Sequence, residues 1–145
     1  MENAINNRIK ILITEEDPDN QKLILLYFRK YFDITPCYSS DEFYDLLNKD
    51  KYDLILMDIS IRGAKNGLEL TRELKRNPAY AKIPVLCYTA HALYQDRLNA
   101  LEAGCDAYLS KPSDLKTLLV AIIDLLKTSG KTLTFDIPAE SYSFS

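Results

Sequence analysis

Residues 54–57 form an unbroken apolar run that stops at the carboxylate of Asp58. A run of this kind is typical of a strand buried on both faces, as in a parallel sheet covered by helices. Two further strand-like runs stop in a similar way, one at Glu15 and Glu16 and the other at Lys111. Because α/β sheets build their sites at the carboxyl ends of strands, these runs predict a site that contains acids and one amine.

Strand and helix patterns alternate along the chain, which predicts an α/β fold with a parallel sheet between layers of helices. We expect five strands, at residues 8–14, 34–38, 53–58, 84–88 and 106–109. The final helix has the clearest pattern because its leucines and isoleucines recur at helical spacing from Leu115 to Leu126. This apolar stripe is expected to pack on the sheet.

Residues that favour helix starts precede several of the helices. Asp17 can cap the first helix, and Ser39 with Glu42 has the spacing of a capping box before the second. The fourth helix is expected at about residues 91–103. Ser113 is the expected cap of the final helix.

The length of 145 residues fits one domain. We expect this domain to occupy residues 1–127 and to be followed by a tail, 128–145, without an output domain. In the tail, Leu133, Phe135 and Ile137 alternate with polar residues, so the tail is either disordered or able to add to a sheet edge.

Composition excludes several classes of function. The net charge is −3, and lysine and arginine are scattered among acids, so no cationic stripe is available for nucleic acid. The sequence has neither a leader-like start nor an apolar stretch long enough to span a bilayer, which predicts a cytoplasmic protein without membrane contact. The three cysteines lack metal-ligand spacing and are expected to be reduced thiols in the core.

If the strands are parallel, Glu15, Glu16, Asp58, Thr89 and Lys111 share one edge of the sheet. Crowded carboxylates resist ionising together, so such a site requires a cation. Mg²⁺ fits because it prefers one or two carboxylates combined with waters and phosphate oxygens. The sequence therefore predicts a magnesium-dependent phosphate site.

These residues belong to five segments, 11–18, 53–58, 67–70, 85–90 and 103–112, through which the chain resembles the receiver domain of bacterial two-component response regulators. The resemblance is to the chemotaxis-regulator type, either as a stand-alone chain or as part of a hybrid protein. It implies a flavodoxin-like, doubly wound, five-stranded parallel sheet in the order 2-1-3-4-5 with five helices. It also implies a phosphoacceptor protein that assists its own Mg²⁺-dependent phosphorylation and dephosphorylation, not an enzyme in the ordinary sense.

By this resemblance, Asp58 accepts a phosphoryl group from a sensor histidine kinase or a histidine phosphotransfer protein. Glu16, helped by Glu15, holds Mg²⁺ or Mn²⁺, and the carboxylate of Asp58 and the backbone carbonyl of Ser60 are further ligands. Many receivers have aspartate at the position of Glu16, and the extra methylene puts the metal geometry in question. The loop after Asp58 is also one residue longer than usual and has Arg62 where proline is frequent.

The resemblance assigns the remaining roles. Lys111 contacts one phosphoryl oxygen, Thr89 donates a hydrogen bond to another, and Ala90 leaves room beside it. Tyr108 is the aromatic residue whose position changes when the site is occupied. His91, two residues after Thr89, stands where the family can influence how water reaches the acyl phosphate.

Signalling is then expected through a surface between about residues 91 and 127, where Tyr94, Gln95 and Lys116 are candidate contacts with an unidentified downstream protein. A homodimer through the final helix or the tail stays open. The alternative is a pseudo-receiver, a constitutive adaptor or dimerisation module whose metal binding Glu16 has impaired. A phosphate-handling enzyme is disfavoured because Ser60 stands where related phosphohydrolases have a second aspartate.

Overall fold

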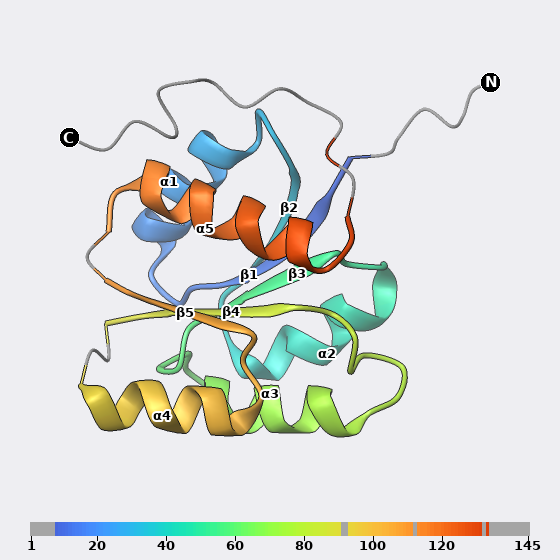
Figure 1. Cartoon of the computed structure of the whole chain (residues 1–145), viewed down its shortest axis with the longest axis vertical. Helices are drawn as coiled ribbons and strands as arrows, with labels where there is room; N and C mark the ends of the chain where they lie inside the picture. Colours follow the sequence, from blue (N-terminus) through green and yellow to red (C-terminus); the bar gives the residue numbers. More distant parts are fainter. Residues whose placement is uncertain (1–7, 91–92, 112, 132, 134–145) are drawn as a thin grey trace.

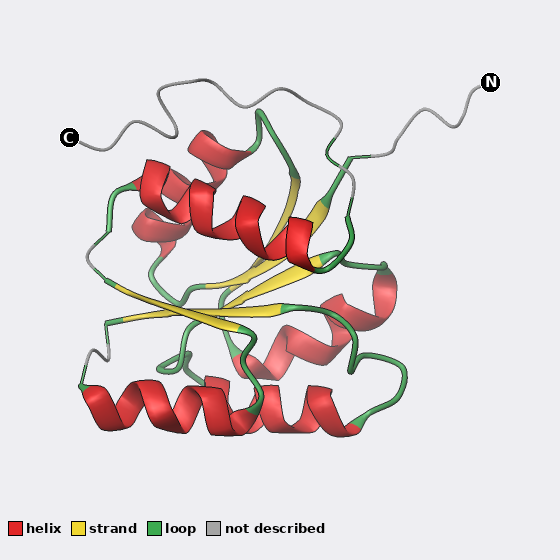
Figure 2. Cartoon of the chain, in the orientation of Figure 1, coloured by secondary structure: helices red, strands yellow, loops and turns green. Residues whose placement is uncertain are grey.

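The computed structural model describes residues 8–90, 93–111, 113–131 and 133. Within these residues, five strands alternate with five helices (Figures 1 and 2). The elements are β1 (Lys10–Thr14), α1 (Pro18–Phe28), β2 (Asp33–Cys37), α2 (Ser40–Lys49), β3 (Leu54–Met57), α3 (Gly67–Arg76), β4 (Val85–Thr89), α4 (Tyr94–Ala103), β5 (Ala107–Ser110) and α5 (Leu115–Thr128).

The five strands form one sheet in the order β2-β1-β3-β4-β5, and all neighbouring pairs are parallel. Helices α1 and α5 cover one face, while α2, α3 and α4 cover the other (Figure 1). Strands β3 and β4 are buried along their whole length, as expected for central strands with helices on both sides. The predicted fold class and strand order are confirmed.

The sheet separates two hydrophobic cores, and successive residues of β4 face them in turn. Leu86 and Tyr88 pack in the core under α1 and α5, whereas Val85 and Cys87 pack in the core under α2, α3 and α4. This alternation follows from the two-residue period of a strand. The predicted thiols are confirmed, since all three cysteines are free and buried.

The predicted caps are correct at some helices and wrong at others. Asp17 caps α1, accepting a hydrogen bond from the backbone N–H of Asp19 at 3.1 Å. Ser39 precedes α2, but its side chain makes no capping hydrogen bond, so the predicted capping box is wrong. The carboxylate of Glu42 instead accepts a hydrogen bond from the backbone N–H of Tyr38 at 3.2 Å.

The final helix is capped one residue later than predicted. Asp114 is the cap, and its Oδ1 accepts a hydrogen bond from the backbone N–H of Thr117 at 2.7 Å. The predicted cap, Ser113, instead donates its hydroxyl hydrogen bond to the carbonyl of Ser110 at 2.7 Å. Helix α4 begins at Tyr94, three residues after the predicted start.

Helix α5 continues to Thr128, one residue beyond the predicted domain boundary. Leu133 is partly buried against the core under α1 and α5. The predictions for His91 and for residues 134–145 of the tail lie outside the described residues.

Among the residues that are described, none of the helices has the length and apolar character needed to cross a membrane.

Candidate phosphoryl-transfer site

The carboxyl ends of β1, β3 and β5 bring two acids and an amine together. Glu15 follows β1, Asp58 follows β3 and Lys111 follows β5. Lys111 lies between the two acids, with its Nζ 2.7 Å from Oε1 of Glu15 and 3.1 Å from Oδ2 of Asp58. The side chains of Glu15 and Asp58 are only 5% and 7% exposed, and that of Lys111 is 22% exposed. Such burial strengthens charge interactions relative to the open surface.

The charge of Lys111 is stabilised by these neighbours. Burial alone would lower the pKa of Lys111, but the hydrogen bond to Glu15 and the charge of Asp58 raise it above its ordinary value. The ammonium group also lies 5.2 Å from the centre of the Tyr88 ring, within the range of a cation–π contact. Lys111 is therefore a permanent positive charge at this edge under neutral conditions.

The other oxygen of Asp58 accepts hydrogen bonds from neighbouring loops. Thr89, at the end of β4, donates its hydroxyl to Oδ1 of Asp58 at 3.1 Å. Ser60 donates both its backbone N–H and its hydroxyl to the same oxygen, each at 3.0 Å. Ala90 follows Thr89 and is exposed. The structure thus gathers Asp58, Lys111, Thr89 and Ser60, four residues that the sequence reasoning selected.

Thr14 is a residue of the site that the sequence reasoning missed. Its hydroxyl oxygen accepts a hydrogen bond from the backbone N–H of Asp58 at 2.8 Å, while the hydroxyl donates to the carbonyl of Leu56 at 3.3 Å. Thr14 is buried at the end of β1, so it connects the backbone of the aspartate to the neighbouring strand. A hydroxyl at the end of an otherwise apolar run was the available signal.

Glu15 and Glu16 have different surroundings. Glu15 is the buried acid that contacts Lys111. Its other oxygen accepts a hydrogen bond from the backbone N–H of Asp17 at 3.1 Å. Glu16 is 35% exposed and faces the guanidinium of Arg62 at 3.6 Å. Glu16 is therefore a partly exposed acid whose ion-pair partner is Arg62.

Tyr108 is the second of the four residues of β5 and pairs with Cys87 of β4 in the sheet register. Its ring packs against the core under α2, α3 and α4. Within the described part of the chain, its buried hydroxyl has no hydrogen-bond partner. Burial raises the pKa of this hydroxyl. A buried hydroxyl without a hydrogen-bond partner is energetically unfavourable.

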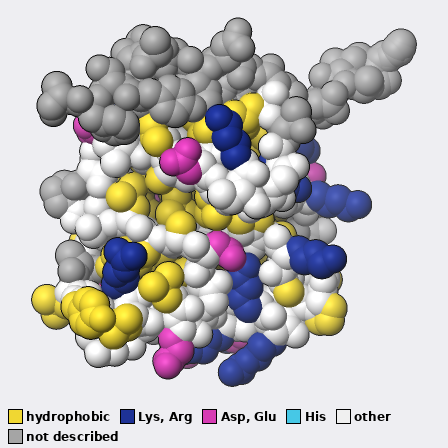
Figure 3. All heavy atoms as spheres, viewed as in Figure 1, with side chains coloured by type: hydrophobic (Ala, Val, Ile, Leu, Met, Phe, Trp, Pro, Cys, Tyr) yellow, Lys and Arg dark blue, Asp and Glu magenta, His cyan; other side chains and the backbone are white. Residues whose placement is uncertain are grey.

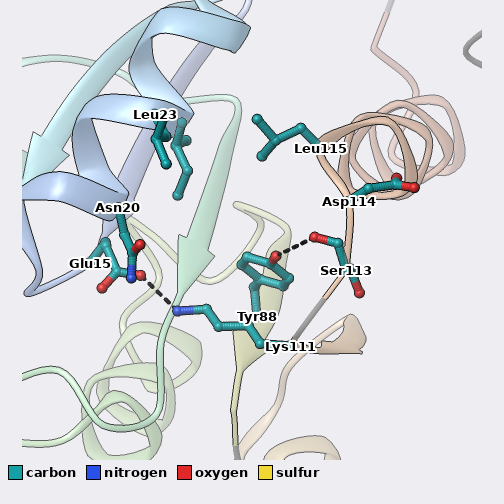
Figure 4. Close-up of a pocket in the computed structure, with 9 residues that line it drawn as sticks. Glu15, Asn20, Leu23, Tyr88, Lys111, Ser113, Asp114 and Leu115 are labelled. Atoms are coloured by element: carbon teal, nitrogen blue, oxygen red, sulfur yellow. Dashed lines mark hydrogen bonds and ion pairs between the residues drawn. The ribbon is translucent and has the colours of Figure 1, made fainter.

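A pocket of about 330 Å³ opens beside Lys111 and Glu15 (Figure 4). One wall comes from α1, including Leu23, and the other from the segment that leads into α5, including Ser113. Tyr88 also lines the pocket, and its hydroxyl donates a hydrogen bond to the carbonyl of Ser113 at 3.3 Å. The pocket gives access to the ammonium group from the α1 side.

The donor set of this edge suits a magnesium ion. Asp58, Glu15 and Glu16 supply hard carboxylate oxygens. The described residues contain no group of three or more acidic, histidine or cysteine side chains that could hold a metal ion by themselves. Magnesium does not require such a cage, because it keeps several waters and uses one or two carboxylates with phosphate oxygens. The residues therefore fit the cation that receiver domains generally use.

Five parallel strands in this order, with five helices on two faces, define the flavodoxin-like receiver fold. The model of the response regulator receiver domain matches residues 11–123, and the chain belongs to this family. Receiver domains are phosphoacceptors of two-component signalling that work with histidine kinases or phosphotransfer proteins.

Curated relatives and solved structures agree with this family. The chain is 34% identical to the transcriptional regulatory protein CiaR of Streptococcus pneumoniae, over 88% of the chain and 57% of that protein. It is 38% identical to the hybrid signal transduction histidine kinase I of Dictyostelium discoideum, over 78% of the chain and 7% of that protein. A two-component response regulator from Clostridium difficile has a TM-score of 0.77 at 29% identity, covering 86% of the chain and 100% of that structure.

The chain thus spans little more than half of the transcriptional regulators that it matches, and a small part of the hybrid kinase. The receiver domain is what these proteins share with it.

Proposed function

We propose that the chain is a phosphorylatable receiver in which Asp58 accepts a phosphoryl group and changes the protein's affinity for a partner protein. The proposal rests on two groups that contact the Asp58 carboxylate. The Nζ of Lys111 lies 3.1 Å from one carboxylate oxygen, and the hydroxyl of Thr89 lies 3.1 Å from the other. A carboxylate between an ammonium group and a hydroxyl donor at the carboxyl edge of a sheet suits phosphoryl transfer, which depends mainly on positioning and charge neutralisation.

In the proposed reaction, a carboxylate oxygen of Asp58 attacks the phosphorus atom of a phosphohistidine. The nitrogen–phosphorus bond of the donor breaks, and its electron pair remains on the histidine nitrogen. The product is an acyl phosphate on Asp58. Lys111 and Thr89 then move from the carboxylate to the phosphoryl oxygens, and the exposed Ala90 leaves room for this group.

A magnesium ion, or Mn²⁺ in its place, neutralises charge on the carboxylates and the phosphoryl oxygens when it is bound. Asp58, Glu15, Glu16 and the backbone carbonyl of Ser60 are the proposed ligands. The buried contact between Glu15 and Lys111 keeps Glu15 close to Asp58, which supports its part in this set.

The proposed phosphoryl donor is a sensor histidine kinase or a histidine phosphotransfer protein, acting in the cytoplasm. The pocket between α1 and the start of α5 leads to Lys111 (Figure 4). Leu23 and Leu26 of α1 are 59% and 42% exposed, although they are apolar. An exposed apolar surface beside a charged pocket supports docking of the donor protein on this side.

The proposed output surface is α4 with its surroundings. Figure 3 shows hydrophobic side chains gathered over α4, where Leu93 and Tyr94 are 74% and 76% exposed and Leu98 and Leu101 are also exposed. Tyr108 packs next to this helix and would transmit the state of the site to it. Tyr94, Gln95 and Lys116 are the proposed contacts with a downstream protein or with a second copy of the chain.

Labelling with a small acyl-phosphate donor and Mg²⁺ tests the proposed phosphoacceptor. Intact-protein mass spectrometry should show the addition of one phosphoryl group to the wild type and none to Asp58→Asn. Asp53→Asn is a matched control, because Asp53 lies at the opposite end of β3, and it should label like the wild type. Failure of the wild type to label, or equal labelling of Asp58→Asn, would refute the proposal.

The pseudo-receiver remains a second candidate, and the contact between Arg62 and Glu16 favours it, because an arginine already neutralises one proposed metal ligand. A constitutive adaptor would not respond to the cation. Amide chemical shifts recorded with and without millimolar Mg²⁺ separate the two candidates, since shifts at the edge formed by Glu15, Asp58 and Lys111 are expected only for the phosphorylatable receiver.

A further inference from the structure

We propose that Arg62 is a built-in competitor of the divalent cation, whose guanidinium neutralises Glu16 in the metal-free protein and thereby raises the Mg²⁺ concentration needed to fill the site. The inference rests on the proposed function, since it assumes that Mg²⁺ binds at this edge. It concerns a residue of the loop after Asp58 to which the resemblance assigned no role.

The fold specifies where Arg62 stands. The backbone N–H of Ser40, at the start of α2, donates a hydrogen bond to the carbonyl of Arg62 at 2.8 Å. The preceding residue, Ile61, is buried, and the next residue, Gly63, has a φ of 118°. A Cβ at Gly63 would lie 2.2 Å from the hydroxyl oxygen of Ser40, so only glycine fits there. The backbone on both sides of Arg62 is therefore fixed beside the site.

The charges at this edge explain why Arg62 matters. Lys111 contacts both Glu15 and Asp58, whereas Glu16, the residue after Glu15, has Arg62 as its ion-pair partner at 3.6 Å. These ion pairs contain three carboxylates and two cationic side chains. A divalent cation that uses Glu16 as a ligand is repelled by the guanidinium of Arg62, which lies 3.6 Å from Oε2 of Glu16.

The solvent exposure of the two ion pairs, Arg62–Glu16 and Lys111–Glu15, indicates which pair a cation can break. Arg62 and Glu16 are 66% and 35% exposed, whereas Lys111 and Glu15 are 22% and 5% exposed. Ion pairs at an exposed surface are weak and are screened by salt. Arg62 is therefore a competitor that Mg²⁺ can displace, and its effect is modest and dependent on salt.

Direct titration with Mg²⁺ of the wild type and of Arg62→Gln tests this inference, using calorimetry or amide chemical shifts. Arg62→Gln should bind Mg²⁺ about two- to fivefold more tightly at low salt, as expected for the loss of an exposed ion pair. The difference should shrink at about 1 M monovalent salt, where the screening length falls to about 3 Å. Arg76→Gln removes the same charge from the far end of α3 and should leave the affinity unchanged.

A double substitution shows whether the effect passes through Glu16. In the Glu16→Gln background, Arg62→Gln should no longer tighten binding, because no carboxylate is left for the arginine to neutralise. Equal affinities of the wild type and Arg62→Gln would overturn the inference and leave the proposed function intact. Absence of Mg²⁺ binding in both proteins would instead contradict the magnesium part of the proposed function, and the inference with it.

Discussion

At the scale of single residues, Thr14 is the link between β1 and the backbone of the aspartate. Thr14→Val keeps the shape of the side chain but removes the acceptor that the Asp58 N–H uses at 2.8 Å. A buried donor left without a partner destabilises a protein by about 1–3 kcal/mol. We expect Thr14→Val to lower the free energy of unfolding by that amount in urea titrations. Thr14→Ser keeps the hydroxyl and should lose less, and equal losses in the two variants would contradict this role.

Lys111 gives the site a defined dependence on pH. Because the pKa of Lys111 is raised above 10.5 in the folded protein, the folded state holds this proton more tightly than the unfolded chain does. The resulting stabilisation is fully present below pH 10.5 and is lost as the pH rises through the higher folded-state pKa. The difference in unfolding free energy between the wild type and Lys111→Met should therefore be largest near neutral pH.

The same difference should disappear in strongly alkaline solution, where the wild-type amine is neutral too. Ionisation of the tyrosines affects both proteins and cancels in the comparison. A difference that stays constant from neutral to strongly alkaline pH would mean that the charge of Lys111 contributes nothing to stability.

The two neighbouring acids show what a sequence can and cannot reveal about single side chains. The apolar run before them predicted that both stand at the edge of the sheet. It could not reveal which one turns inward, because the regular alternation of a strand stops at Thr14. Glu15 is turned inward by two contacts, with Lys111 from a distant segment and with the N–H of Asp17. The first of these contacts cannot be predicted from local sequence.

At the scale of elements, the start of α3 is built against the aspartate. A Cβ at Gly67 would lie 2.2 Å from the carbonyl oxygen of Asp58, which is backbone and cannot rotate away. Gly67→Ala should therefore displace the end of β3 and destabilise the protein by about 1–3 kcal/mol, the usual range for overpacking. Thermal unfolding measures the loss, and the rate of phosphoryl labelling from the small donor should fall with it.

Leu68→Ala provides the matched comparison for this prediction. Leu68 is partly buried in the same turn of α3, so its truncation should also lower stability. It does not press on Asp58, and its labelling rate should stay close to that of the wild type. If both variants lost labelling equally, general destabilisation would explain the result.

The elements themselves were largely predictable, because apolar runs and helical periodicity are local signals. The helix starts were less so, since several residues able to cap stand side by side. Ser113 and Asp114 can both cap the start of α5. The carbonyl of Ser110 accepts a hydrogen bond from the hydroxyl of Ser113, which leaves Asp114 as the cap. Asn66 is the cap of α3 and exchanges hydrogen bonds with Glu69 in a complete capping box.

At the scale of the whole molecule, one sheet forms a wall of two hydrophobic cores, one on each of its faces. Local patterns predicted strands and helices but did not specify which strands are neighbours, so the order β2-β1-β3-β4-β5 was expected from the family resemblance alone. In the structure, the central strands contribute alternate residues to both faces. Neither core can be lost without removing support from the sheet that bounds the other.

This arrangement predicts that the described domain unfolds as one cooperative unit. Ile122 lies in the core under α1 and α5, and Ile55 lies in the core on the opposite face of the sheet. Ile122→Val and Ile55→Val should each lower the free energy of unfolding by about 0.5–1.5 kcal/mol. Transitions followed by far-ultraviolet circular dichroism and by tyrosine fluorescence should coincide in both variants. The effects should add in the double variant within about 0.5 kcal/mol, because the sites are separated by the sheet. Two separate transitions, each shifted by only one substitution, would show instead that the two faces unfold independently.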